Sequence, residues 1–269
     1  MTFASTLAAL HSNGHKGFRS EALTIERRNF PQFFITAPSP CPYVPGRLER
    51  KVFTHLVGPD ATNLNTQLSQ GGFRRSQNIA YRPACDGCHA CTSVRVPVKE
   101  FEWTRSFRRV LARNSDIRST VVKAQATSEQ YSLFRAYIDT RHSEGGMANM
   151  TVLDFVSMVD DNLVESRVVE YRLPPGKDGM AGELIAAVLI DILGDGLSMI
   201  YSFYEPGYEN RSLGTLIILD NILRVERMGL TYIYLGYFVQ DSPKMRYKGR
   251  FLPQQRLSAE GWRTVLPTP

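Results

Sequence analysis

The sequence predicts an α+β protein with two parts, a cysteine-containing irregular N-terminal domain over residues 1–103 and a second domain over residues 104–269. Three observations predict this class. Gly, Pro and Cys are frequent up to about residue 101, and the apolar runs there are short, which is typical of turn-rich structure. From Thr104 onward, helical and strand patterns alternate. With 269 residues, 43% of them hydrophobic, the chain is long enough to bury a substantial core without disulfides.

Basic residues are concentrated in two segments. The whole chain has 32 Lys and Arg against 26 Asp and Glu, a net charge of +6. Residues 71–124 alone hold 11 basic and four acidic residues, and residues 244–263 hold six basic and one acidic. Such segments favour binding to a phosphate backbone, although ordinary solvated charge would give the same pattern.

No segment has the pattern of a secretory signal or a membrane span. The first thirty residues lack a basic stretch followed by an apolar run, and the apolar run 184–190 ends at Asp191. We therefore expect a soluble, cytoplasmic protein.

The N-terminal part contains one clear helical pattern, over residues 60–68, and short apolar runs at residues 33–36 and 93–96. Thr104 is a suitable cap for the next helix, whose buried stripe is Phe107, Val110 and Leu111. The arginines of this helix lie together on another face, which would suit phosphate binding. They are Arg105, Arg108, Arg109 and Arg113.

The remaining elements follow in a recognisable order. Helices are expected over residues 128–141 and from a Thr151–Asp154 capping box to residue 159. Strands over 167–173, 183–192 and 197–204 form a meander with a tight turn at 194–196. A helix over 211–228, which Gly229 ends, leads to a strand over 231–235. This order is that of the GNAT acyltransferase fold, so we expect a GNAT-like second domain.

That fold requires a tight loop before the crossover helix, where free backbone N–H groups hold the donor's phosphates. Here the loop is residues 210–215, with the sequence NRSLGT. An Arg, a Ser and a Gly at a helix N-terminus suit anion binding, but they also make an ordinary helix cap.

All four cysteines lie in the N-terminal part: Cys41, Cys85, Cys88 and Cys91. Three of them form C-x-x-C-x-x-C, and such clustering in a cytosolic chain favours a metal over a disulfide. The spacing favours an iron–sulfur cluster more than zinc, while His89 keeps a mixed zinc site open. The alternative is a reduced, metal-free packing cluster.

Several stretches resemble the arginyl-tRNA-protein transferase family. They are CPYVPGR at 41–47, GGFRRSQN at 71–78 with YRPAC at 81–85, YSFY at 201–204 with RSLG at 211–214, and YLGY at 234–237 followed by KMRYK at 244–248. The similarity runs from about residue 31 to 253 and is closest to the bacterial branch. Eukaryotic members carry a C-x-x-C pair and an adjacent C-C pair, whereas this chain has a single Cys41 and C-x-x-C-x-x-C. This departure weakens any transfer of cluster chemistry from those enzymes.

The resemblance implies that leucine moves from leucyl-tRNA to proteins that begin with Asp or Glu, which marks them for degradation by the N-degron (N-end rule) pathway. The implied partners are leucyl-tRNA and these proteins, without a membrane, and no cofactor is required for transfer. The sequence itself does not separate leucine from arginine as the donor amino acid.

The implied reaction is aminolysis of an ester, in which the acceptor's α-amine attacks the aminoacyl carbonyl. An α-amine has a reference pKa of about 7.7–8.0, so it needs little base strength and positioning supplies much of the rate. Asp191 or Glu205 is the candidate base, and Tyr204 or Tyr137 is the candidate proton donor. The alternative is that Asp191 ends a strand and Glu205 caps a turn.

An acidic acceptor requires a fixed guanidinium, which can bind its carboxylate bidentately. Arg74, Arg75 and Arg82 are the candidates because they lie in the family stretch beside the cysteines, with pairing to local acids or phosphate as the alternative.

Contacts with tRNA are expected at the loop 210–215, at two C-terminal lysines and on the arginine helix. These candidates are Arg211, Ser212, Gly214, Lys244, Lys248, Arg108 and Arg109.

Two other functions fit parts of the sequence. The first is a coenzyme A-dependent N-acetyltransferase, for which the loop supplies Arg211 and Gly214 but has Leu216 where a small residue is usual. The second is a non-catalytic, metal-containing nucleic-acid-binding module, which would leave the acyltransferase-like half without a purpose.

Overall fold

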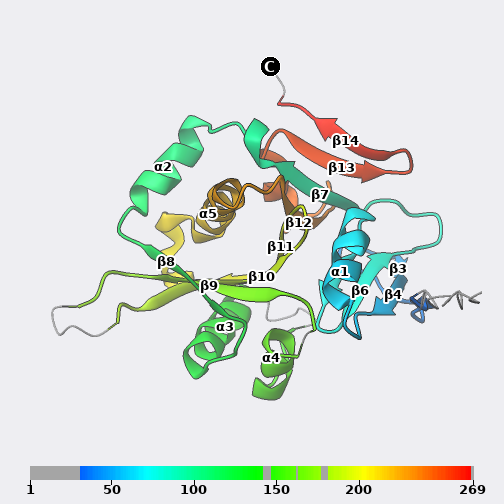
Figure 1. The fold of residues 1–269 in the computed structure, drawn as a ribbon, viewed down its shortest axis with the longest axis horizontal. Helices are drawn as coiled ribbons and strands as arrows, with labels where there is room; N and C mark the ends of the chain where they lie inside the picture. Colours follow the sequence, from blue (N-terminus) through cyan, green and yellow to red (C-terminus); the bar gives the residue numbers. More distant parts are fainter. Residues whose placement is uncertain (1–30, 142–146, 162, 177–180, 268–269) are drawn as a thin grey trace, which may run out of the picture. The chain divides into compact units, whose positions relative to one another are not determined.

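An eight-stranded sheet organises the part of the chain that the computed structural model describes, which is residues 31–141, 147–161, 163–176 and 181–267. Its strand order is β14-β13-β7-β12-β11-β10-β9-β8 (Figure 1). In chain order these strands are β7 (Thr92–Pro97), β8 (Arg118–Lys123), β9 (Ser166–Arg172), β10 (Leu184–Ile192), β11 (Gly196–Tyr204), β12 (Tyr232–Phe238), β13 (Gln254–Ser258) and β14 (Gly261–Val265). The pair β11–β12 is parallel, and the other neighbours are antiparallel.

Helices cover both faces of this sheet. They are α2 (Arg105–Arg113), α3 (Ser128–Arg141), α4 (Val152–Val159) and α5 (Leu213–Arg227). In Figure 1, α2 and α5 lie on one side of strands β8 to β10, while α3 and α4 lie on the other. The described residues also form three short 3-10 helices: η1 (Val98–Glu100), η2 (Pro206–Arg211) and η3 (Arg246–Arg250).

The two-sided cover explains why β10 is almost entirely apolar. Alternate side chains of a strand point to opposite faces. Ala186 and Val188 belong to the core that includes α5. Ala187 and Leu189 belong to the core that includes α3 and α4. A strand buried on both faces must be apolar at nearly every position, and here only its last residue is partly exposed.

The predicted helices and strands of residues 104–235 are confirmed, with small shifts at their ends. Thr104 caps α2 by accepting a hydrogen bond from the backbone of Phe107 at 3.3 Å. The capping box of Thr151 and Asp154 at the start of α4 is present in both directions. Gly229 follows α5 with a φ of 69°, a left-handed conformation that favours glycine. The mixed α+β, GNAT-like fold with its crossover through α5 is therefore established.

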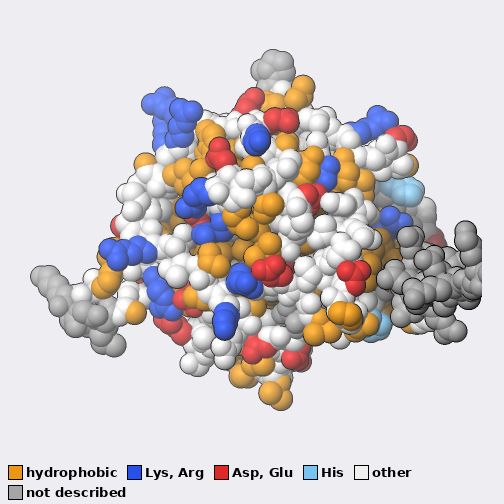
Figure 2. Space-filling model, viewed as in Figure 1, with side chains coloured by type: hydrophobic (Ala, Val, Ile, Leu, Met, Phe, Trp, Pro, Cys, Tyr) orange, Lys and Arg blue, Asp and Glu red, His pale blue; other side chains and the backbone are white. Residues whose placement is uncertain are grey.

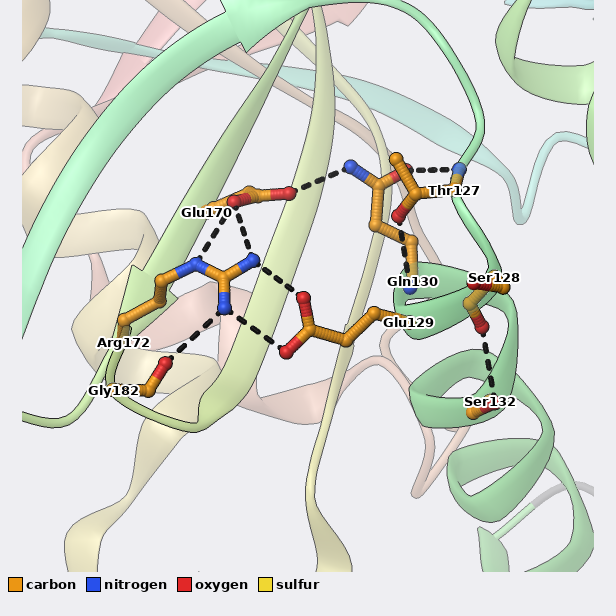
Figure 3. A network of polar contacts seen from close by, with 8 residues as sticks. All are labelled: Thr127, Ser128, Glu129, Gln130, Ser132, Glu170, Arg172 and Gly182. Atoms are coloured by element: carbon orange, nitrogen blue, oxygen red, sulfur yellow. Dashed lines mark hydrogen bonds and ion pairs between the residues drawn. The ribbon is translucent and has the colours of Figure 1, made fainter. Parts of the chain in front are cut away.

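A polar network fixes the N-terminal end of α3 to the sheet (Figure 3). The guanidinium of Arg172 on β9 donates to Glu129 at 2.6 and 2.9 Å and to Glu170 at 3.0 and 3.1 Å. Gln130 donates to the other oxygen of Glu170 at 2.8 Å. The hydrogen bond from Arg172 lowers the pKa of Glu129, so this carboxyl is ionised at neutral pH. It holds α3 in place over β9 and β10.

The N-terminal part forms smaller sheets beside the large one. A four-stranded sheet has the order β1-β4-β6-β5, and a separate pair consists of β2 and β3. The elements are β1 (Phe34–Ile35), β2 (Ser39–Pro40), β3 (Leu48–Glu49), β4 (Lys51–His55), α1 (Ala61–Gln70), β5 (Arg74–Ser76) and β6 (Ile79–Pro83). The predicted helix at 60–68 corresponds to α1.

A buried ion pair joins the small sheet to the large one. Arg75 of β5 donates to the two carboxylate oxygens of Asp191 on β10, at 2.6 and 2.8 Å. Asn65 and Ser166 also donate to Asp191, at 3.1 and 2.7 Å. Arg75 is 2% exposed and Asp191 is fully buried. Both charges are therefore satisfied inside the protein.

The domain boundary at residue 103 stays a prediction. Strand β7 precedes that boundary and lies between β12 and β13 in the large sheet, so the sheet includes residues from both predicted domains. In the described part of the chain, no helix is long and apolar enough to cross a membrane. The prediction about a secretory signal concerns residues 1–30, which lie outside the described residues.

Candidate active site

The parallel strands β11 and β12 separate after a short region of pairing. They pair over three positions, which end at Ser198 and Tyr234. Beyond that point each strand has a bulge on its other side. Ile200 is the extra residue of β11 opposite β10, and Leu235 is the extra residue of β12 opposite β7. Since bulges bend strands and increase their twist, the two strands diverge and leave a gap in the sheet.

A cavity of about 350 Å³ lies at this gap, and we call it the splay cavity. Its size falls within the range of small-ligand pockets. Both bulge residues line it, together with side chains from the N-terminal part, from the helices on both faces and from the segment around η3. The lining residues are Tyr43, Arg74, Tyr137, Ile138, Met147, Met199, Ile200, Tyr201, Ser202, Ile218, Leu235, Lys244, Met245, Tyr247 and Lys248.

Arg74 reaches from β5 into the gap between the diverging strands. Its guanidinium donates to the backbone carbonyl of Ile200. On the other side it packs over Gly236, where a Cβ atom would overlap the guanidinium. Gly236 also has a φ of 73°, so this position requires glycine for both reasons.

The charge of the splay cavity is one-sided. Its described lining contains three basic side chains, Arg74, Lys244 and Lys248, and no Asp or Glu. Four tyrosines supply hydroxyl groups. Burial raises the pKa of Tyr43 and of Tyr201 to about 12. The phenols therefore stay protonated and neutral at physiological pH, and the cavity is suited to an anionic ligand.

Lys248 differs from the other two cations because it is buried. It is 7% exposed, and its Nζ donates to the carbonyl of Tyr237 at 2.7 Å. Burial, and next the nearby Arg74, lower the pKa of Lys248 to about 7. The sequence predicts that Lys248 adds charge near the 3′ end of the tRNA. Because its ammonium is buried and lines the cavity, it is not available to a phosphate at the surface.

Tyr137 and Tyr204 lie together at the edge of the splay cavity. Tyr137 lines it, and burial raises the pKa of its hydroxyl. Its ring centroid lies 4.8 Å from that of Tyr204. Gly214 at the start of α5 packs on Tyr204, since a Cβ there would lie 3.2 Å from the ring. The arrangement brings the predicted proton donors and the crossover loop side by side.

The loop 210–215 is partly exposed and is held by α2. Asn114 donates to the carbonyl of Arg211 at 2.9 Å, and Arg113 donates to the carbonyl of Asn210. Ser212 adopts a left-handed conformation with a φ of 54° and makes no side-chain cap to α5. The guanidinium of Arg211 binds Asp116 at 2.8 and 3.0 Å, and this hydrogen bond lowers the pKa of the Asp116 carboxyl. A phosphate at this loop would therefore compete with Asp116 for Arg211.

The arginines of α2 form an exposed basic surface next to this loop. Arg105, Arg108, Arg109 and Arg113 are all exposed. Figure 2 shows Lys and Arg side chains gathered at the upper left of the molecule, over α2. A hydrogen bond from Asn114, at the end of α2, to the carbonyl of Arg211 ties this helix to the loop before α5.

The four cysteines line a second, larger cavity of about 860 Å³, which we call the thiol cavity. Burial raises the pKa of Cys91 to about 11, and the three other thiols contribute in the same direction because they are close. Arg82, a predicted acceptor ligand, lines the thiol cavity and not the splay cavity. Tyr43 lines both cavities and separates them.

The described thiols do not form a metal site as they stand. No three His, Cys, Asp or Glu side chains among the described residues converge closely enough to hold an ion. The donor chemistry suits a thiophilic metal, and all four cysteines line one cavity. The iron–sulfur or zinc site therefore remains a prediction from the sequence, and it takes no part in the proposed chemistry.

Both predicted bases, and Arg75 as well as Arg82 among the predicted acceptor ligands, lie outside the lining of the splay cavity. Asp191 and Arg75 occupy each other in the buried ion pair, so neither can touch a substrate. The carboxylate of Glu205 caps η2 by accepting a hydrogen bond from Gly207 at 3.3 Å, and Glu205 does not line the cavity. Asp191 and Arg75 therefore cannot act on a ligand because they are buried in their ion pair, and Glu205 cannot do so because its carboxylate caps η2.

Comparison with known proteins identifies the family. The model of the arginine-tRNA-protein transferase N terminus matches residues 39–109, and that of the C terminus matches residues 129–258. An aspartate/glutamate leucyltransferase of Rhodopseudomonas palustris (strain HaA2) is 61% identical over 243 residues, which cover 89% of this chain and 95% of that protein. The chain belongs to the arginine-tRNA-protein transferase family. A second aspartate/glutamate leucyltransferase, from Bradyrhizobium sp. (strain BTAi1), is 61% identical over 246 residues, 90% of this chain and 95% of that one.

Solved structures are more distant. The C-terminal domain of a putative lysylphosphatidylglycerol synthetase from Agrobacterium fabrum has a TM-score of 0.42 and 13% identity, and covers 70% of this chain and 54% of that chain. FemX has a TM-score of 0.42 and 12% identity, and covers 67% of this chain and 61% of that chain. At this distance the strand order of the large sheet and the crossover through α5 define the fold.

The family stretches meet at the splay cavity. Residues 71–78 supply Arg74, 201–204 supply Tyr201, and 244–248 supply both lysines. Sequence reasoning missed Tyr43 and the bulges at Ile200 and Leu235. One signal was available, because a glycine inside a strand pattern, here Gly236, often marks a close approach of another group.

Proposed function

We propose that this protein transfers leucine from leucyl-tRNA to the α-amino group of proteins that begin with Asp or Glu. The observation that carries the proposal is the splay cavity, whose described lining combines basic side chains, without a carboxylate, with an apolar wall. The close relatives named aspartate/glutamate leucyltransferase support it.

Arg74 is the proposed ligand of the acceptor's side-chain carboxylate. It is the one arginine of the three predicted candidates that lines the splay cavity. Its hydrogen bond to Ile200 and its packing on Gly236 fix the guanidinium, which favours bidentate recognition of a carboxylate. A neutral acceptor such as Asn would leave this cation unpaired.

The same lining favours leucine over arginine as the transferred amino acid. An arginyl side chain would require an acidic partner, and the described lining offers only cations and hydroxyl groups at its polar positions. The apolar wall would accept a leucine side chain. It consists of Ile138, Met147, Met199, Ile218, Leu235 and Met245.

The tRNA is proposed to lie along α2 and to present its 3′ end at the loop 210–215. The exposed Arg108 and Arg109 would bind the acceptor-stem phosphates, which are read as charge and not as sequence. Ser212 and Gly214 lie where the chain enters α5, beside Tyr204 and the cavity. Lys244, exposed at the cavity, would add charge near the last nucleotides.

In the reaction the acceptor's amine nitrogen bonds to the aminoacyl carbonyl carbon, and the ester bond to the ribose oxygen breaks. Holding both reactants in one cavity supplies much of the acceleration. The hydroxyls of Tyr137 and of the adjacent Tyr204 are the proposed donors to the leaving oxygen, and burial raises the pKa of Tyr137, so its hydroxyl carries its proton at the working pH.

A coenzyme A-dependent acetyltransferase fits this site less well. Arg211, which would bind a pyrophosphate, is paired with Asp116. Arg74 donates to the backbone carbonyl of Ile200 in the gap between β11 and β12. The extended arm of coenzyme A would need this gap and this carbonyl. A purely structural nucleic-acid module has no use for the splay cavity.

One experiment separates these functions. Purified protein is incubated with labelled leucyl-tRNA or arginyl-tRNA, a peptide that begins with Asp and an isosteric peptide that begins with Asn, with and without excess acetyl-CoA. We expect leucine on the Asp peptide only, without competition from acetyl-CoA. Transfer of arginine, acetylation of the peptide, or tRNA binding without any transfer would each overturn the proposal.

A cytoplasmic location and a role in N-degron degradation follow from this function and belong to the same proposal. A metal at the four cysteines is a separate proposal, supported by four thiols on one cavity. Elemental analysis of anaerobically purified protein tests it, and the absence of both iron and zinc would overturn it.

A further inference from the structure

Lys248 is a buried lysine that lines the splay cavity without a carboxylate partner in the described part of the chain. Its Nζ makes one hydrogen bond, to the carbonyl of Tyr237 at 2.7 Å. An ammonium group that is removed from water and has no anion beside it is costly, whereas the neutral amine is not. Lysines in such surroundings serve as bases in other proteins because burial shifts them toward the neutral form.

The groups that face the cavity with Lys248 do not offset its charge. Arg74 comes from β5, and Lys244 comes from the loop before η3. The remaining titratable groups are phenols, contributed by the loop 41–47, α3, β11 and η3. They are Tyr43, Tyr137, Tyr201 and Tyr247, and burial raises the pKa of each. With cations and neutral phenols around it, Lys248 has a pKa lowered to about 7, first by burial and then by Arg74.

The geometry leaves the amine of Lys248 able to accept a proton. A neutral lysine has two N–H bonds and one lone pair, and the bond to Tyr237 requires only one N–H. In an N-terminal Asp the α-amine and the carboxylate are separated by only a few bonds. An acceptor whose carboxylate binds Arg74 therefore has its amine in the cavity that Lys248 lines.

We propose that neutral Lys248 is the general base that takes the proton from the attacking α-amine, an inference that rests on the proposed function. The amine nitrogen bonds to the aminoacyl carbonyl carbon while its proton passes to Nζ of Lys248. The ester bond then breaks, the ribose 3′ oxygen leaves, and it takes up the proton that Lys248 has gained, relayed through the tyrosine hydroxyls. Lysine returns to its neutral form, and the products are the new amide and the free hydroxyl.

This role replaces the two carboxylates predicted from the sequence. Asp191 is closed off in its ion pair with Arg75, and Glu205 caps η2 outside the cavity. Among the described residues that line the splay cavity, Lys248 and Lys244 are the amines, and Lys248 is the buried one.

The test is the pH dependence of kcat/KM for the Asp peptide in single-turnover transfer. This parameter reports the free enzyme and the free acceptor, whose amine has a pKa of about 7.7–8.0. If two groups must lose a proton, log kcat/KM rises with a slope approaching two below pH 7. With the acceptor's amine alone the slope is one. The parent protein is expected to give a slope of two, and a slope of one would overturn the proposal without any variant.

Variants of Lys248 distinguish a general base from a side chain that only holds the carbonyl of Tyr237 in place. Lys248→Gln keeps an N–H for the Tyr237 carbonyl but cannot take a proton. We expect its kcat at pH 8 to fall by about 100-fold, its acceptor KM to stay within about threefold of the parent, and its slope to fall to one. A parent-like rate and slope in this variant would mean that Lys248 is only a tether. Lys123→Met, an exposed lysine on β8, is the matched control and should behave as the parent does.

Chemical rescue gives a second readout. A tertiary amine should restore transfer by Lys248→Ala in a saturable manner, because it can take a proton but cannot itself accept leucine stably. No rescue in a folded variant would count against the base. If the parent does not transfer leucine at all, the proposed function fails; if it transfers leucine but Lys248→Gln is unimpaired, only this inference fails.

Discussion

Arg74 and Arg75 are neighbours on β5, and their surroundings are opposite. Because successive side chains of a strand point to opposite faces, one arginine enters the closed interior and the other enters the gap in the sheet. Arg75 binds both carboxylate oxygens of the fully buried Asp191. Arg74 binds a backbone carbonyl beside a cavity whose described lining has no carboxylate.

This difference distinguishes a charge that stabilises the fold from a charge that is available to a ligand. The buried pair is complete, since Asn65 and Ser166 also donate to Asp191, so it leaves nothing for a ligand to satisfy. The splay cavity is incomplete without an anion, because its described lining holds the cations Arg74 and Lys244 and no acid. An acidic acceptor would supply that anion.

The largest expected effect is on the free energy of unfolding, at the buried ion pair of Arg75 and Asp191. Arg75→Ala should lower the free energy of unfolding by about 3–5 kcal/mol, because it leaves the buried Asp191 without its cation. Chemical denaturation measures this change. The double variant Arg75→Met with Asp191→Leu should recover most of the loss; if the single variant costs less than about 1 kcal/mol, the pair is not a structural joint.

The next largest effect is expected on acceptor binding by Arg74, the arginine at the splay cavity. Arg74→Gln should lower kcat/KM for the Asp peptide by about 100-fold, or about 2.7 kcal/mol, mainly through the acceptor KM. The affinity for tRNA and the free energy of unfolding should change little, since no carboxylate is left unpaired. If Arg82→Gln, at the thiol cavity, has the larger effect, then the acceptor binds there and not in the splay cavity.

A smaller effect is expected on tRNA binding. Replacing Arg108 and Arg109 with Ala should weaken tRNA binding by about tenfold and reduce the slope of log affinity against log salt by about one unit for each arginine. Filter binding at several salt concentrations measures both. Arg227→Ala, an exposed arginine near the other end of α5, is the matched control. An unchanged salt slope would contradict the proposed path of the tRNA.

The smallest effect is at the cap of α2. Thr104→Ala removes the acceptor for the Phe107 amide and should cost about 1 kcal/mol in stability. It should weaken tRNA binding by less than about threefold, because the arginines themselves remain. Thermal unfolding measures this loss of stability, and Thr104→Ser should retain most of the parent's stability because serine also caps. An unchanged stability in Thr104→Ala would show that α2 does not depend on the cap.

Most elements of residues 104–235 were predictable because their signals are local. The cap at Thr104, the capping box at Thr151 and the stop at Gly229 each act within one turn of helix. By contrast, β8 was not predicted, because its residues are mostly exposed and lack an apolar alternation. The place of β7 between β12 and β13 depends on pairing with residues far along the chain, which no local pattern reports.

The candidate site was only partly predictable for the same reason. The sequence identified Arg74, Tyr137, Lys244 and Lys248 as functional candidates, and these residues line the splay cavity. It could not separate Arg74 from Arg75, because the choice depends on Asp191, which lies far along the chain from both. Nor could it distinguish a buried Lys248 from an exposed one, since burial there depends on packing against β12 and β5.

The most direct test of the splay cavity is a crystal structure with an Asp-starting peptide and an amide-linked analogue of 3′-leucyl-adenosine. We predict that the peptide's side-chain carboxylate contacts Arg74 and that the leucine side chain lies among Met199, Ile218 and Leu235. If both molecules bind elsewhere, for example at the thiol cavity, and the gap between β11 and β12 holds neither of them, the splay cavity is not the active site.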